Sequence, residues 1–125
     1  MRKENTIMKK SEQIKINTIC NDVFTDAMRE YYREQRYTHT IKIGKPLRHC
    51  QAKVFETENF YILQSYETLI AAIRKVGNVC INFMHHEYNF DKHATGATSA
   101  QQFYKFVKDY VPFDKCPLIY IYKAV

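Results

Sequence analysis

Apolar residues recur at helical spacing in the first third of the chain. Residues 18–36, TICNDVFTDAMREYYREQR, carry one stripe at 3.6-residue spacing, made of Ile19, Val23, Phe24, Ala27, Met28 and Tyr31. Asn17 or Thr18 can cap the start of this segment, which is predicted to be a helix. Upstream, residues 1–11 are polar and are expected to be frayed, whereas QIKIN at 13–17 alternates and could add a short strand.

The middle of the chain changes to an alternating, strand-like pattern. YTHTIKI at 37–43 alternates, and AKVFE and NFYILQSY then flank Thr57-Glu58-Asn59, which predicts a hairpin. TLIAAIRK could form a buried strand or a helix, but Gly77-Asn78 and VCINFMHHEY follow it and favour a second hairpin. If the last segment is a strand throughout, His85 lies on the face of Phe83 and His86 on the face of Met84.

The C-terminal third predicts a second helix and a final strand. ATSAQQFYKFVKDYV has Thr98 or Ser99 as its cap and Pro112 as its stop, and PLIYIYKAV alternates. Together these patterns predict a single α+β domain over residues 1–125. It should have a largely antiparallel sheet of about five or six strands, with the two helices on one face.

Composition narrows the class of protein. Hydrophobic residues at 46% and charged residues at 26% are typical of a globular domain, and no apolar run approaches the roughly 20 residues of a membrane span. No apolar core follows the charged N-terminus, so no secretory signal is expected and the protein is predicted to be cytoplasmic. The four cysteines are spaced 30 or more residues apart, which argues against a zinc ribbon and predicts free thiols.

The stretch MHHEYNFDKH at 84–93 holds three of the five histidines and is the candidate metal site. Adjacent His85 and His86 point to opposite faces of a strand, so a zinc ion would need His93 together with one of them. Glu87 or Asp91 could add a ligand, and a thiolate could come from elsewhere in the chain. The competing interpretation is a polar turn with a hydrogen-bonded core histidine, and no spacing here is diagnostic of zinc.

The net charge of +6 is uneven, since residues 1–50 hold 11 basic against 6 acidic side chains. Along the first helix, Arg29, Arg33 and Arg36 lie on one exposed face beside Tyr32, which is typical of a phosphate-binding stripe. Asp26 and Glu30 interleave with these arginines and could pair with them instead. Ten tyrosines suggest a protein-binding surface, either near Tyr31, Tyr32 and Tyr37 or on the C-terminal strand at Tyr120 and Tyr122.

No motif of an enzyme is present: the sequence has no glycine-rich phosphate loop, no G-x-S-x-G and no H-E-x-x-H. The segment KVFETENFYILQSYETLIAAI, followed by a hairpin and ATSAQQFYKFVKDY, resembles a family of small phage-encoded proteins of unknown function. The matching residues are Ser65, Tyr66, Thr68, Ala71, Ala72, Thr98, Ser99, Lys105 and Phe106. The resemblance spans residues 53–110, and the loop before the second helix departs from it by being longer and rich in histidine.

The resemblance implies a phage origin and a fold, not an activity. In size and character the chain is also similar to type II anti-CRISPR proteins, some of which contain zinc. We therefore expect a non-enzymatic protein that blocks a host defence protein, an RNA-guided CRISPR nuclease above all. Its contact surface would be Arg29, Tyr32, Arg33, Arg36 and Tyr37, and any zinc would be structural. The alternative is a small basic nucleic-acid-binding accessory protein.

Overall fold

The computed structural model describes residues 2–34, 44–46, 52–86 and 97–125. It contains two helices, α1 (Arg2–Arg33) and α2 (Ala97–Tyr110), and a sheet of six strands. The strands are β1 (Lys45–Pro46), β2 (Ala52–Glu56), β3 (Phe60–Ser65), β4 (Thr68–Arg74), β5 (Val79–Asn82) and β6 (Leu118–Ile121). In the described part of the chain, no helix is long and apolar enough to cross a membrane.

The strands lie in the sheet in the order of the sequence. Strands β1 to β5 are antiparallel neighbours, and both predicted hairpins are present: β2–β3 around residues 57–59, and β4–β5 around a short 3₁₀ turn (Val76–Asn78). Gly77 has a φ of 85°, a conformation that glycine adopts without steric cost. Strand β6 pairs in parallel with β5, because α2 lies between them and carries the chain back across the sheet.

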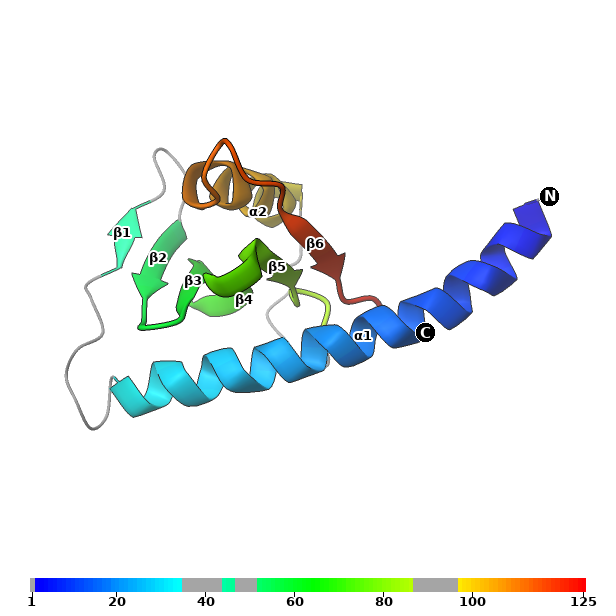
Figure 1. Cartoon of the computed structure of the whole chain (residues 1–125), viewed down its shortest axis with the longest axis horizontal. Coiled ribbons are helices and arrows are strands. Elements are labelled where there is room, and N and C mark those ends of the chain that lie inside the picture. Colours follow the sequence, from blue (N-terminus) through cyan, green and yellow to red (C-terminus); the bar gives the residue numbers. More distant parts are fainter. Residues whose placement is uncertain (1, 35–43, 47–51, 87–96) are drawn as a thin grey trace.

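The two helices cover opposite faces of the sheet, as Figure 1 shows. One core packs Phe103, Phe106 and Val107 of α2 against residues such as Leu63 and Ile73 of the sheet. The other core packs α1 against the opposite face, through Cys20, Val23, Ala27, Phe60, Ile62, Ala72, Val79, Ile81 and Phe83. The α+β class and the largely antiparallel sheet are confirmed, whereas the prediction that both helices lie on one face is wrong.

Helix α1 is much longer than its apolar stripe indicates. Its 32 residues include 2–11, which were expected to be frayed, and 13–17, where the predicted strand is wrong. At about 1.5 Å per residue the helix is about 48 Å long, and its N-terminal part extends beyond the sheet (Figure 1). The segment 37–43, predicted as a strand, lies outside the described residues.

Side-chain amides of α1 hold the end of the C-terminal strand. Asn17 donates from Nδ2 to Lys123 O at 2.7 Å and accepts from Lys123 N at 3.1 Å. One turn earlier, Gln13 Nε2 donates to Ile121 O at 2.9 Å. The two amides thus act on the backbone of residues 121–123 as a neighbouring strand would. This contact suits a helix at 13–17, since a helix sets Gln13 and Asn17 about 6 Å apart, close to the spacing of Ile121 and Lys123, whereas a strand would separate them by about 13 Å.

Candidate functional site

The histidine-rich stretch does not continue strand β5. The strand ends at Asn82, and His86 N donates to Phe83 O at 3.0 Å, so residues 83–86 form a turn. The buried side chain of Asn82 causes the break, because its Oδ1 accepts from Met84 N at 3.0 Å. Asparagine commonly stabilises turns by such a bond to the backbone two residues on. The prediction of a strand through Tyr88 is therefore wrong from residue 83 onward, as far as His86.

Within this turn, His86 is a core residue. It is 4% exposed, and its Nε2 is hydrogen-bonded to Asn21 Oδ1 at 2.8 Å. Its ring stacks on Phe24 at 5.0 Å and lies 4.7 Å from the ring of Tyr122. Alternation placed His86 on the opposite face of the sheet, beside Met84. The turn instead directs it towards α1, where it joins the helix to the C-terminal segment.

The structure describes two of the three predicted zinc ligands. His85 is exposed, His86 is buried with Nε2 bonded to Asn21, and His93 lies outside the described residues. In the described ranges, no three His, Cys, Asp or Glu side chains are grouped so that they could hold a metal ion. A zinc site built on His93 and one neighbouring histidine therefore stays a prediction. If it used His86, that ring would have to bind through Nδ1 or release Asn21.

Two of the four thiols are unsuited to chemistry at neutral pH. Burial raises the pKa of Cys20 to about 12, despite a backbone hydrogen bond that lowers it, and raises the pKa of Cys80 to about 11. They lie in the cores on opposite faces of the sheet. Cys116 is exposed, and Cys50 lies outside the described residues. Cys20 and Cys80 are thus small core residues rather than nucleophiles.

The predicted contact surface lies at the C-terminal end of α1. Arg29, Tyr32 and Arg33 are exposed there, and the ring of Tyr32, whose residue is 59% exposed, packs edge-on against Tyr31 at 5.2 Å. Arg36 and Tyr37 lie outside the described residues. At the second tyrosine surface, Tyr120 and Tyr122 are half-buried and pack against the core beneath α1.

In the described part of this face, one of the two predicted ion pairs is formed. Arg29 Nη1 lies 3.3 Å from Asp26 Oδ1, as the sequence predicts. Among the described residues, Glu30 pairs with no arginine, contrary to the prediction; the side chain turns inward and is 6% exposed. Its carboxylate accepts hydrogen bonds from the backbone N and the side-chain Nδ2 of Asn59. Arg33 is left without an ion pair to any residue that the structure describes.

Glu30 and Glu34 together hold the β2–β3 turn against α1. Glu34 Oε2 accepts from Glu58 N at 3.1 Å, next to the bonds that Asn59 makes to Glu30. Burial alone would raise the pKa of Glu30, but hydrogen bonds from Thr57, Asn59 and Glu34 outweigh it and lower the pKa below 4.5. The carboxylate is therefore ionised at neutral pH, and its charge is stabilised by hydrogen bonds of the turn rather than by an arginine.

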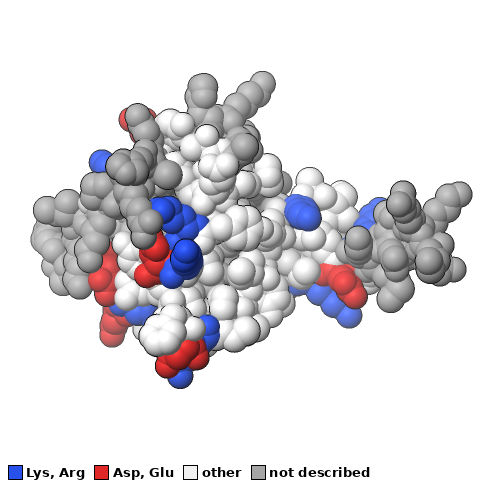
Figure 2. Space-filling view, turned by 90° about the horizontal axis from the view of Figure 1, so that it is seen from above, with Lys and Arg blue, Asp and Glu red and all other residues white. Residues whose placement is uncertain are grey.

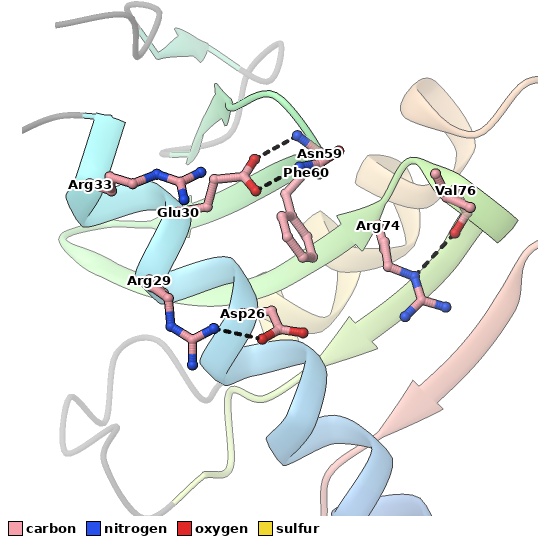
Figure 3. Close-up of a pocket in the computed structure, with 8 residues that line it drawn as sticks. All are labelled: Asp26, Arg29, Glu30, Arg33, Asn59, Phe60, Arg74 and Val76. Atoms are coloured by element: carbon pink, nitrogen blue, oxygen red, sulfur yellow. Dashed lines mark hydrogen bonds and ion pairs between the residues drawn. The ribbon is translucent and has the colours of Figure 1, made fainter. Parts of the chain in front are cut away.

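A groove of about 290 Å³ runs between this part of α1, the start of β3 and the end of β4 (Figure 3). It is lined by Asp26, Arg29, Glu30, Arg33, Asn59, Phe60, Arg74 and Val76. Phe60 supplies an apolar floor, and exposed Val76 an apolar part of the rim. Arg74 joins from β4, its guanidinium held by a hydrogen bond from Nε to Val76 O at 3.1 Å.

Sequence reasoning missed half of this groove. Phe60 and Arg74 follow Arg33 by 27 and 41 residues in the chain. The alternating pattern of their strands does not indicate that they lie beside α1. The available signal was indirect, since Arg74 ends a run of apolar residues and therefore lies at a sheet end. The basic side chains do not form one large surface. On the face in Figure 2, the described acidic and basic side chains are interspersed and no continuous basic patch is visible.

Several of the residues on which the resemblance to phage-encoded proteins rests are buried in the fold. Ser65 of β3 and Ser99 of α2 are fully buried, with their Oγ atoms 2.9 Å apart. Ser65 Oγ also donates to Gln102 Oε1. This polar cluster fixes α2 on the sheet. Both predicted caps, Thr98 and Ser99, lie inside the helix, which begins at Ala97. Compared with known proteins, the chain matches no family model, no curated protein and no solved structure.

Proposed function

We propose that this is a non-enzymatic binding protein whose groove between α1, β3 and β4 takes an acidic segment of a partner protein. The observation that carries the proposal is the commitment of Glu30 to the β2–β3 turn, which leaves Arg33 without an acidic partner in ion-pair contact among the described residues. Guanidinium groups form bidentate hydrogen bonds with carboxylates. Arg33 and Arg74 both line this groove.

The groove suits a protein segment better than a nucleic-acid backbone. Three arginines against Asp26 and Glu30 give its lining a net charge of only +1. A polyanion is held by many cations along its length, whereas an acidic peptide needs one or two together with an apolar contact. Phe60 and Val76 offer that apolar contact, and exposed Tyr32 lies next to Arg33 on the helix. Recognition of this kind needs no catalytic group.

We further propose, from the resemblance to phage-encoded proteins, that the partner is a host defence protein, a type II RNA-guided CRISPR nuclease. The protein would act in the host cytoplasm by covering a surface that the nuclease needs. The runner-up is a nucleic-acid-binding accessory protein that uses Arg29 and Arg33 on phosphates. It is favoured by the exposure of both arginines but weakened by the ion pair of Arg29 with Asp26.

Two assays separate these functions. Purified protein is added to DNA cleavage reactions of several type II nucleases, and separately to labelled DNA and RNA at low salt. Inhibition or co-purification of a nuclease, with no shift of free nucleic acid, supports the proposal. A shift that disappears between low and moderate salt supports the runner-up instead. If no nuclease is inhibited or retained, the assigned partner is wrong.

A further inference from the structure

Among the described strands, β6 is an edge of the sheet, its outer side bonded to α1 at residues 121–123 and unpaired before them. It is the last strand in the sheet order, and its sequence LIYI carries no charge. Leu118 and Ile119 are 49% and 40% exposed, and Phe113 just before the strand is fully exposed. Edge strands usually carry charges, prolines or covering elements that prevent pairing with another chain. An uncharged edge with apolar side chains on both faces is therefore a surface that can accept another strand.

The hydrogen-bonding groups on this edge can be assigned from the pairing with β5. Because Tyr122 N donates to Asn82 O, residues 118, 120 and 122 direct their backbone groups towards β5. Pro117, Ile119 and Ile121 therefore direct theirs outward. Of the outward groups, Ile121 O is occupied by Gln13 Nε2, and Pro117 has no N–H. Among the described residues, Pro117 O receives only a 4.0 Å contact from the Cys116 thiol.

The open groups are complementary to themselves. If two β6 strands pair in antiparallel fashion with a two-fold axis at Ile119, each Ile119 N meets the Ile119 O of the other strand. On either side, Ile121 N then meets Pro117 O. The second bond of this pair would run from the N–H of residue 117 to Ile121 O. Neither group needs it, because Pro117 has no N–H and Ile121 O already accepts from Gln13 Nε2. From this match we propose that the protein forms a homodimer through β6, with one sheet continuous across both copies.

The side chains and α1 fit the same arrangement. Ile119 would contact Ile119 of the second copy on the α2 face, and Leu118 would lie opposite Tyr120 on the α1 face. Helix α1 crosses the edge at Ile121 and Lys123, two to four residues from the axis, or about 7–13 Å at about 3.3 Å per residue. The two copies of α1 therefore pass on opposite sides of the axis. The part of α1 that extends beyond β6 in Figure 1 would lie against the second copy.

This interface is separate from the groove, which lies at the other end of α1, so either proposal can fail alone. Sedimentation equilibrium of the full chain over a concentration series tests it. We expect a species of about twice the 14.9 kDa chain mass, and dissociation on Ile119→Pro. Proline removes only an outward N–H here, so the sheet itself loses no hydrogen bond. Val125→Pro, at an exposed residue outside both β6 and the groove, serves as a control if its circular dichroism is unchanged.

A cross-linking pair measures the register itself. In a Cys116→Ser background, Ile119→Cys should form a disulfide-linked dimer on mild oxidation. Facing residues of a hydrogen-bonded antiparallel pair lie about 5.5 Å apart, within the range of a disulfide. Leu118→Cys, although more exposed, should not cross-link, because it faces Tyr120. A wild-type monomer at every concentration, a dimer that survives Ile119→Pro, or equal cross-linking at 118 and 119 would each overturn the proposal.

Discussion

Replacing Glu30 with alanine tests the contact on which the groove depends. The carboxylate accepts two hydrogen bonds from Asn59, and bonds to a charged group contribute about 1.5–3 kcal/mol each. Asn59 is exposed, so water can replace part of what is lost. We therefore expect the free energy of unfolding to fall by about 2–3 kcal/mol. For a domain of this size, that corresponds to a fall in Tm of roughly 10 °C.

The assay is urea unfolding followed by circular dichroism, with Asp26→Ala as the matched control. Asp26 is one helical turn away and carries the same charge, but its ion pair with Arg29 is exposed on both sides. Its loss should change stability by no more than about 0.5 kcal/mol. If Glu30→Ala unfolds at the same urea concentration as Asp26→Ala, Glu30 does not hold the β2–β3 turn and the account of the groove fails.

Three further predictions follow from particular contacts. Hydrogen bonding keeps the pKa of Glu30 below 4.5, so the stability that the carboxylate contributes is present above that pH and is lost as the pH falls through the lowered pKa. The difference in unfolding free energy between wild type and Glu30→Gln should therefore shrink below about pH 4.5. A constant difference would contradict this. Asn17→Ala should increase amide hydrogen exchange of Lys123 at least several-fold, and unchanged exchange would show that Asn17 does not hold the C-terminal segment. At pH 8, a thiol reagent followed by peptide mapping should leave Cys20 and Cys80 unlabelled until the protein is unfolded, and rapid labelling of either would contradict its burial.

Much of the sheet could be predicted because its local signals agree. The segment 52–74 combines alternating apolar residues with a polar turn at 57–59. Its three strands, β2, β3 and β4, appear within a residue or two of their predicted bounds. The continuous apolar run of β4 also predicts how the helices are placed. Ile70 to Ile73 are all buried, which requires cover on both faces of the sheet and so places the helices on opposite sides.

The errors arise where contacts distant in sequence decide the local structure. Alternation in QIKIN suits a strand, but Gln13 and Asn17, one helical turn apart, bond to the C-terminal segment more than 100 residues away. Alternation likewise extends β5 through the histidines, whereas the side chain of Asn82 ends the strand. Glu30 lies four residues from Glu34 and within reach of arginines, yet the β2–β3 turn takes its carboxylate. No local pattern contains these partners.

Binding through the groove is the central claim, and one measurement tests it most directly. Wild-type protein, the double variant Arg33→Glu/Arg74→Glu and the control Lys108→Glu/Lys115→Glu are immobilised and used to capture partners from host lysate. Both variants have the same net charge, and the control residues are exposed and outside the groove.

We expect wild type and control to retain the same protein, identified by mass spectrometry. Titration with that purified protein should show the groove variant binding it at least ten-fold more weakly, the loss of one charge-assisted contact. Equal binding by all three proteins, or equal loss in both variants, would contradict the claim.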